Sequence, residues 1–259
     1  MKMEILKKIL KVVISISVLI GIWQLAVMLG RYQTSLLPPP AKVFKGMSEL
    51  IKDGTLFTHF KVSLTRFFIG YLSAIIAGVI LGLFLGWNKR IWSFVEPIVQ
   101  VLRPVSPIAW FPFIVLWFGI GDAPAIAIIF IAGFYPILLS TVSGVGNVDG
   151  IYLKVADNFG IRQPQMLFKI VLPAAFPLIA NGLHIALGSA WVFLVAGEMV
   201  GAQSGLGYLI IDARNSLRSD LVLAGIIFIG VLGLLLDRLI RLLESSIEKQ
   251  WGISQRRGN

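Results

Sequence analysis

Six long runs of apolar residues dominate the sequence, and each is close to the length that crosses a lipid bilayer. They are Ile9–Leu29, Leu64–Gly86, Ile98–Phe118, Ala123–Val145, Ala174–Val200 and Leu221–Leu243. A membrane-crossing helix needs about 20 predominantly apolar residues. Because lipid offers no partners to the backbone, a spanning segment must satisfy its own hydrogen bonds, as a helix does. The runs therefore predict an all-α polytopic membrane protein with six transmembrane helices.

The composition agrees with a protein whose surroundings are a lipid bilayer. Hydrophobic residues make up 57% of the chain and charged residues 14%, against about 45–50% and about 25% in soluble domains. The net charge of +10 fits Lys and Arg in cytoplasmic loops better than a nucleic-acid surface, because no soluble segment carries a basic stripe. We therefore expect no nucleic-acid partner.

The first 59 residues form a separate N-terminal part. Lys2, Lys7 and Lys8 precede the first apolar run, as in a secretory signal, but the run is long and no clear cleavage site follows, which favours a retained helix. Pro38–Pro40 then exclude a continuous helix, and Ala41–Lys52 has the spacing of an amphipathic helix at the membrane surface. Residues 60–245 form the main membrane domain, and residues 246–259 a charged tail.

Small residues recur every four positions in the second apolar run. They are Gly70, Ala74, Gly78, Gly82 and Gly86. Four-residue spacing places them on one helix face, where a neighbouring helix can approach closely. Gly182, Ala186 and Ala190 predict a second ridge of this kind in the fifth run.

The third apolar run is irregular, because Arg103, Pro104, Pro107 and Pro112 interrupt it. Such breaks are tolerated where a helix lines a cavity or is packed inside protein. We therefore predict that this run lines a pathway through the membrane, with Ser106 and Trp110 as a polar and an aromatic contact. Packing in the protein core is the equal alternative for these two residues.

The distribution of basic residues predicts the orientation. With six spans both termini lie on one side, and 15 of the 23 Lys and Arg residues fall on that side. Lys and Arg are enriched in cytoplasmic loops. We therefore expect a multi-pass protein of the cytoplasmic membrane, with both termini and the polar segment 146–173 in the cytoplasm.

The sequence lacks the motifs of an enzyme. There is no cysteine, no HExxH or GxSxG pattern and no phosphate-binding GxxxxGK[ST] loop, and His59 and His184 do not make a metal-ligand pair. We expect a non-catalytic chain that binds no cofactor itself.

Charged residues inside the apolar runs are few. Glu198 is a pathway candidate near the outer end of the fifth run, or it lies at the interface; Asp237 is spaced to pair with Arg241. Because no series of carboxylates that could relay protons is visible, a self-contained secondary transporter or channel remains only the alternative function.

The segment 146–173, which we call the coupling loop, carries the most specific pattern. It contains KVADNFGIRQPQMLFKIVLPAAFP, in which Gly160 is followed ten residues later by Ile170 and then by Leu172 and Pro173. This spacing resembles the EAA loop of binding-protein-dependent ABC transporter permeases. Lys154, Val155 and Ala156 stand where that family has Glu, Ala and Ala, a departure that affects the role of the Glu but not the spacing.

The resemblance covers roughly residues 60–245. RPVSPIAWFPFIVLWFGIGD and AGEMVGAQSGLGYLI are similar to segments of permeases of the nitrate, sulfonate, taurine and bicarbonate group. The resemblance implies a type I ABC importer permease fold, with a five-helix core after an extra first helix. It also implies a second permease copy, a cytoplasmic ATPase dimer that binds ATP and Mg²⁺, an extracytoplasmic solute-binding protein, and a small oxyanion as the solute.

The resemblance also implies that the coupling loop docks a short helix in a groove of the ATPase. Gly160 is expected to turn the chain before that helix, and Leu172 and Pro173 to end it and begin the fifth span. The residues expected to serve coupling are Lys154, Val155, Ala156, Asp157, Phe159, Gly160, Met166, Leu167, Phe168, Ile170, Leu172 and Pro173. Of these, Phe159, Met166, Leu167, Phe168 and Ile170 are the expected apolar anchors.

Overall fold

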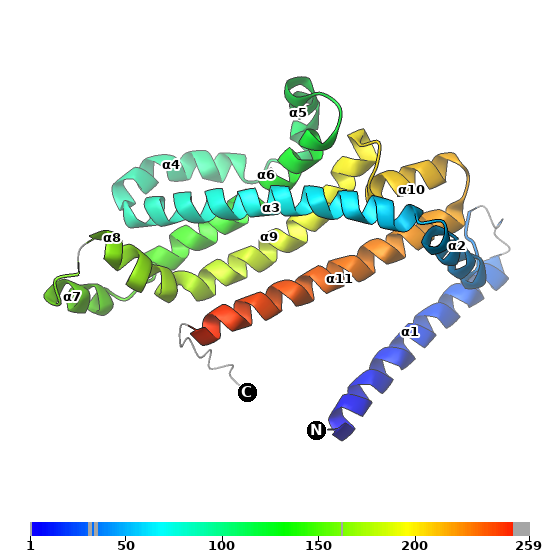
Figure 1. Ribbon diagram of the computed structural model, residues 1–259, viewed down its shortest axis with the longest axis horizontal. Helices are drawn as coiled ribbons and strands as arrows, with labels where there is room; N and C mark the ends of the chain where they lie inside the picture. Colours follow the sequence, from blue (N-terminus) through cyan, green and yellow to red (C-terminus); the bar gives the residue numbers. More distant parts are fainter. Residues whose placement is uncertain (1, 31–32, 34–35, 162, 251–259) are drawn as a thin grey trace.

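The computed structural model describes residues 2–30, 33, 36–161 and 163–250, and within these residues the chain forms helices and no strands (Figure 1). The elements are α1 (Lys2–Gly30), α2 (Pro40–Lys52), α3 (Thr55–Trp87), α4 (Lys89–Leu102), η1 (Pro107–Trp110), α5 (Phe111–Phe118), α6 (Asp122–Gly146), α7 (Gly150–Asn158), α8 (Gln163–Met166), η2 (Leu167–Val171), α9 (Leu172–Gly201), α10 (Leu206–Asn215) and α11 (Ser219–Gln250). The predicted all-α class is confirmed. The end of the predicted tail, residues 251–259, lies outside the described residues.

Five helices are long and apolar enough to cross a membrane, and the predicted third span is the exception. In place of one helix over Ile98–Phe118, α4 meets the η1–α5 segment at 86°. Pro104 and Pro107 cause the break, because neither has an N–H to continue the helix and each disfavours helical geometry in the residue before it. If the bent pair counts as one span, the total is the predicted six.

The core of the bundle is a layer in which α6 lies between α3 and α9. On α3 the small-residue ridge faces α6. A Cβ atom added to Gly70, Gly78, Gly82 or Gly86 would lie 2.5–2.8 Å from a side chain of Ile129, Ile137, Thr141 or Val145, in that order. Each facing residue is 59 positions later in the sequence, so α3 and α6 run parallel in register. Ala74, which is fully buried, completes the ridge opposite Gly133.

The second ridge packs α9 against the other side of α6. Gly182 lies against Ser140, and an added Cβ at Gly144 would be 3.1 Å from the Cβ of Ala175. Ala186 and Ala190 are fully buried in the same interface. The three helices therefore touch through backbone and small side chains, the kind of packing that associates helices in lipid.

Helices α11 and α2 pack beside this layer, on the side away from α4 (Figure 1). On α11, Gly233 packs on Trp191 of α9, whose indole N–H donates to the carbonyl of Ile229 over 3.3 Å. The amphipathic α2 buries Val43, Gly46 and Leu50, and its Gly46 lies against the start of α11. By contrast, no residue in the most apolar stretch of α1 is buried within the chain, as expected for a helix that faces lipid or another subunit.

Arg218 fixes α2 to the turn before α11. Its guanidinium donates to both oxygens of Glu49, at 3.2 and 2.8 Å, and to Asp220 at 2.9 Å. The hydrogen bonds from Arg218 hold the pKa of Glu49 below its usual range. At the opposite end of the bundle, α7 projects from the junction of α6 and α9 (Figure 1).

Replacing Gly82 with Leu tests the contact between α3 and α6. A Cβ atom would lie 2.5 Å from that of Thr141, so the helices must separate, which costs about 1–3 kcal/mol or more. We expect a lower thermal unfolding midpoint and poor recovery of folded protein in detergent. Gly230→Leu is the matched control, because nothing lies within 4 Å of a Cβ at this α11 position. Equal stability of the two variants would contradict the packing.

Candidate functional site

The coupling loop begins with a short capped helix, α7. The Asp149 carboxylate accepts the N–H of Ile151 at its start, over 2.9 Å. At its end, Gly160 has a φ of +71°, its N–H donates to Asp157, and the N–H of Ile161 donates to Ala156. These two bonds form a Schellman motif, which stops a helix and turns the chain. The predicted turn at Gly160 is therefore present, although it follows a short helix as well as preceding one.

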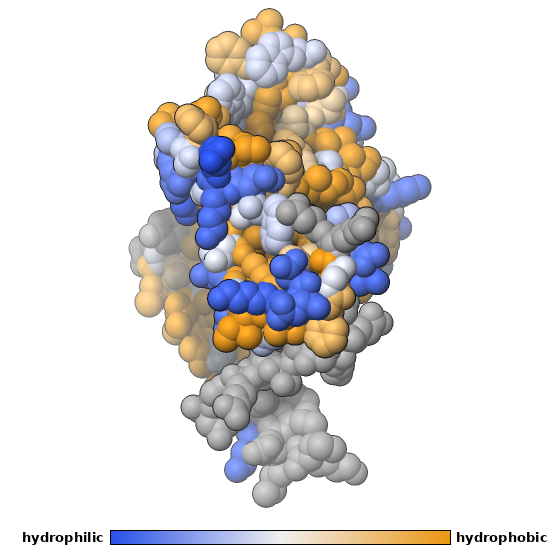
Figure 2. Space-filling view, turned by 90° about the vertical axis from the view of Figure 1, so that its left-hand side faces the viewer, coloured by the Kyte–Doolittle hydropathy of each residue, from blue (hydrophilic) through white to orange (hydrophobic). Residues whose placement is uncertain are grey.

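The outer surface of α7 and its C-terminal cap carries exposed apolar side chains among polar ones. Ile151, Tyr152 and Phe159 are 64%, 61% and 81% exposed. Figure 2 looks onto this end of the molecule, where hydrophobic patches lie among hydrophilic ones. Ala156 faces inward and is 2% exposed. The loop thus presents exposed apolar side chains on a helix fixed at both ends.

The chain after Gly160 differs from the sequence prediction. Leu172 and Pro173 do not end a loop helix, because α8, η2 and α9 form one helix that continues to Gly201. The reason is a π-helical turn over Leu167–Val171. Such a wider turn relieves the clash between the proline ring and the carbonyl four residues earlier. The separate short helix is α7, and the segment after Gly160 belongs to the fifth span.

The expected apolar anchors divide into two groups. Phe159 and Phe168 are exposed, at 81% and 61%. Met166 is 7% exposed, and Leu167 packs against the chain's own core. The other positions expected to serve coupling lie as follows: Lys154, Val155 and Asp157 are exposed, and Ile170, Leu172 and Pro173 are half-buried. A charge at Met166 would therefore disturb the fold itself, whereas Phe159 is free to touch a partner.

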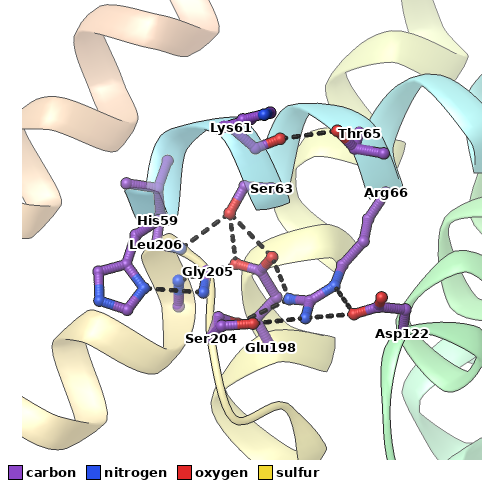
Figure 3. Close-up of polar contacts among 11 residues, drawn as sticks. His59, Lys61, Ser63, Thr65, Arg66, Asp122, Glu198, Ser204, Gly205 and Leu206 are labelled. Atoms are coloured by element: carbon purple, nitrogen blue, oxygen red, sulfur yellow. Dashed lines mark hydrogen bonds and ion pairs between the residues drawn. The ribbon is translucent and has the colours of Figure 1, made fainter. Parts of the chain in front are cut away.

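A polar cluster with a buried centre lies at the opposite end of the bundle (Figure 3). We call it the polar clamp and define it by Ser63 and Arg66 of α3, Asp122 at the start of α6, Glu198 of α9, and Ser204. Arg66 donates to Asp122 at 2.5 and 2.7 Å and to Glu198 at 2.8 Å, and its side chain is only 3% exposed. It also donates to the carbonyl and hydroxyl oxygens of Ser204.

Glu198 is held on every side by donors. Ser63 lies 2.8 and 2.9 Å from its two oxygens, and the N–H of Gly207 donates over 2.9 Å. The turn after α9 fits around this carboxylate: Gly205 has a φ of +108°, and a Cβ there would collide with Glu198. The carboxylate therefore occupies the space that a side chain at position 205 would fill. Glu198 is 1% exposed, and its contact with a solute remains a prediction.

Sequence reasoning missed Arg66 and Asp122 as members of this cluster. The available signal was an arginine three residues into an apolar run, together with a glutamate near the same end of another run. A charge in such a position requires a partner. The clamp ties α3, α6, α9 and the start of α10 together at one end.

The other expected polar residues lie apart from the clamp and the loop, except His59. The ring nitrogen Nδ1 of His59 accepts the N–H of Gly205 over 3.0 Å. His184 pairs with Glu244 at 3.0 Å, and Asp237 with Arg241 at 2.9 Å, as its spacing predicted. Ser106 is exposed and Trp110 half-buried in the break between α4 and α5. Among the described residues, no group of three His, Asp or Glu side chains is placed to hold a metal ion.

Comparison with protein families identifies the chain. Residues 74–249 match the family model of the binding-protein-dependent transport system inner membrane component. The chain belongs to this family. It is thus a multi-pass membrane protein of ABC transporter permease type, and the region matched contains the α6–α9 hairpin with the coupling loop.

Curated relatives of this permease share most of its length. It is 37% identical to the aliphatic sulfonates transport permease protein SsuC of Bacillus subtilis, over 90% of this chain and 84% of that protein. It is 34% identical to the taurine transport system permease protein TauC of Escherichia coli, over 89% and 86%. It is also 34% identical to the nitrate import permease protein NrtB of Synechocystis, over 93% and 90%. The predicted group of permeases is confirmed.

A solved structure shows the same fold. A chain of the MetNI methionine ABC transporter in an inward-facing conformation superposes with a TM-score of 0.55 and 18% identity. The match covers 70% of this permease and 92% of that chain. The predicted type I importer permease fold is therefore confirmed, with α1 and α2 preceding the family match.

Breaking the polar clamp should destabilise the permease strongly. In Arg66→Met, Glu198 is left buried without its cation, which costs about 3–5 kcal/mol. We expect a large fall in the thermal unfolding midpoint in detergent, and Arg66→Met combined with Glu198→Met should recover part of it. Arg241→Met is the control, because the Arg241 and Asp237 side chains are 62% and 37% exposed and such pairs contribute about 0–1 kcal/mol. Equal, small losses in both single variants would show that the clamp is not a stabilising contact.

Proposed function

We propose that this permease is the membrane-spanning subunit of an ABC importer, driven by a separate cytoplasmic ATPase dimer that touches α7. The observation that carries the proposal is the exposed apolar surface of α7, with Phe159 81% exposed beside a Schellman turn. An exposed apolar patch on a fixed element is typical of an interaction site. A helix that fits a partner's groove also transmits rigid-body motion. ATP and Mg²⁺ would bind to the partner.

The proposed orientation has the coupling loop and both termini in the cytoplasm. The structure changes the tally of basic residues, because Arg66 lies in the buried clamp and Arg103 at the corner after α4. Without these two, the count is 14 on the proposed cytoplasmic side against 7 on the other. Basic residues are still in excess on the side of α7, so the positive-inside rule still favours a cytoplasmic α7.

The proposed assembly contains two copies of this permease and an extracytoplasmic solute-binding protein. No residue in the most apolar stretch of α1 is buried within a single chain. A face of α6 and α9 that carries polar side chains is also left uncovered. Both features are expected where a second subunit completes the route. The relatives are named for sulfonates, taurine and nitrate, and we propose a small solute of this oxyanion type.

The proposed mechanism is alternating access. Closure of the ATPases would pull the two α7 helices, and each α7 is joined to α6 on one side and to the continuous α8–α9 helix on the other. Because α3, α6 and α9 are interlocked through glycines and the clamp, each copy would move largely as one body. The permease would bind and release the solute without changing it covalently.

Topology can be tested with reporter fusions. Fusions at Asn88 and Gly150 should report cytoplasm, and fusions at Lys52 and Ser216 the outside, because these two pairs lie at opposite ends of the bundle. Alkaline phosphatase and green fluorescent protein give opposite signals and check each other. An external signal at Gly150 would contradict the proposal, since an ATPase could not reach α7.

Coupling can be tested by Phe159→Asp. An unpaired charge in an apolar groove is costly, so we expect loss of ATPase co-purification and of the ATP hydrolysis stimulated by loaded binding protein. Leu217→Asp is the matched control, because Leu217 is equally exposed, at 82%, at the other end of the bundle. The permease itself should fold normally in both variants.

The turn at Gly160 allows a second test of coupling. Gly160→Val should also uncouple, since a β-branched residue is strained at a φ of +71° although nothing lies within 4 Å of its Cβ. Gly160→Asn should be milder, because Asn tolerates this conformation. Normal coupling in both Phe159→Asp and Gly160→Val would leave the loop as a mere connector.

A further inference from the structure

Two adjoining hollows lie beside the corner between α4 and α5. Their volumes are about 180 and about 320 Å³, and both are lined by Arg103 and Pro136. The first extends along Ala132, Tyr135 and Ser189, and the second along Ser140, Ser143 and Asn181. Together they form one groove with polar side chains among apolar ones, which neither the coupling loop nor the polar clamp explains.

The groove follows one face of each of two helices. On α6 its lining residues are spaced by three or four positions, as they are on α9: Ala132, Pro136, Ser140 and Ser143, then Leu178, Asn181, Ile185, Ser189 and Phe193. Such spacing puts successive residues on one helix face. The face is therefore continuous over several turns and carries polar groups along its length.

In the proposed topology, Arg103 lies within the membrane. The helix α4 starts at Lys89, at the end of the bundle that carries α7, and runs back beside α3 (Figure 1). Its 14 residues carry the chain about 21 Å, at about 1.5 Å per residue. A hydrocarbon core is about 30 Å thick, so the corner at Arg103 is far from a cytoplasmic loop.

Among the described residues, the Arg103 guanidinium has no counterion. In the described part of the chain it takes part in no hydrogen bond or ion pair, whereas Arg66, Arg218 and Arg241 each pair with carboxylates. Arg103 is also exposed. A charged side chain at membrane depth is costly and marks a pathway by default. An unpaired cation in an open polar groove has room for an anion.

Neutral polar side chains line the same two hollows as the cation. The side chains of Tyr135, Ser140, Asn181 and Ser189 donate no hydrogen bond to another described residue, and Ser143 only accepts one, from Asn147. Hydroxyl and amide groups can donate to the oxygens of a bound anion. A guanidinium adds a planar fork that matches the oxygens of nitrate, sulfonate or carboxylate in two places.

We propose that Arg103, with Ser140, Asn181 and Ser189, forms a transit site for a small oxyanion in the groove between α6 and α9. This proposal rests on the proposed function, and it places a positively charged side chain on the solute's route through the permease. One guanidinium among neutral donors holds an anion weakly enough for release. The proposed ligand is a dissolved oxyanion. The phosphate of a lipid headgroup has the same chemistry, and the labelling experiment distinguishes the two.

The test uses a single cysteine in the full-length permease, in phosphatidylcholine vesicles. The chain has no native cysteine, and Ile185→Cys places one in the groove beside Arg103 without removing a donor. The probes are an anionic reagent, 2-sulfonatoethyl methanethiosulfonate, and a cationic one, its trimethylammonium analogue. The measured quantity is the ratio of the anionic to the cationic labelling rate.

Removing the charge should lower this ratio. We expect Arg103→Gln to lower it by about tenfold or more, because a nearby unit charge concentrates counter-ions by at least that factor. Arg103→Lys should retain most of the ratio. Arg90→Gln is the matched control: it makes the same change on the same helix, at an exposed position that lines neither hollow. Sodium nitrate should slow anionic labelling in the presence of Arg103 and not in Arg103→Gln.

Three outcomes would overturn the site: no labelling of Ile185→Cys by either probe, an unchanged ratio in Arg103→Gln, or protection that depends on added phosphatidylglycerol and not on nitrate. The last would assign Arg103 to a lipid headgroup. These outcomes are independent of the importer proposal, which fails instead when ATPase association is insensitive to the α7 variants. A fall in the ratio without ATPase coupling would leave an anion groove in a permease of another kind.

Discussion

The close approach of α3 and α6 is the contact on which the rest of the structure depends. The two helices run parallel in register, with Gly78 against Ile137 and Gly82 against Thr141. Parallel neighbours cannot be joined by a tight turn, so the chain must first return along the bundle. The return is α4, and the proline-rich corner after it lets η1 and α5 lead back to Asp122 at the start of α6. The third span, from α4 to α5, is therefore the connection that the α3–α6 contact requires.

The same contact explains why Arg66 and Glu198 can be buried at the end of the bundle opposite α7. Once α3 and α6 are in register, Arg66 reaches Asp122 at the first turn of α6, and the antiparallel α9 brings Glu198 to the same place. Asp122 also lies at the positive end of the α6 dipole. Small residues supply no directional contact, so the glycine ridges allow sliding, whereas the clamp fixes the position of each helix end. Ridge and clamp are complementary parts of one rigid unit.

Features that depend on local sequence were predictable, and features that depend on contacts between distant residues were not. The lengths of the apolar runs predicted α3, α6, α9 and α11, and the helical spacing of apolar residues predicted the amphipathic α2. Gly160 was correctly expected to turn the chain. The pairing of Arg66 with Glu198 joins residues 132 positions apart and needed the helix register. The continuity through Leu172 and Pro173 was missed, because a π-helical turn has no sequence signal as strong as that of proline.

The contacts on the three faces of α6 limit how a route through this permease can open. One face is locked to α3 at Ile129, Ile137 and Thr141, and a second to α9 near Ser140 and Gly144. The third, with Ala132 and Pro136, lines the groove beside Arg103. Because α6 and α9 touch through Gly182 and Gly144, the groove between them cannot widen much without breaking both ridges. In the proposed dimer, access must therefore change by movement of one copy against the other, while each copy keeps its own half of the route.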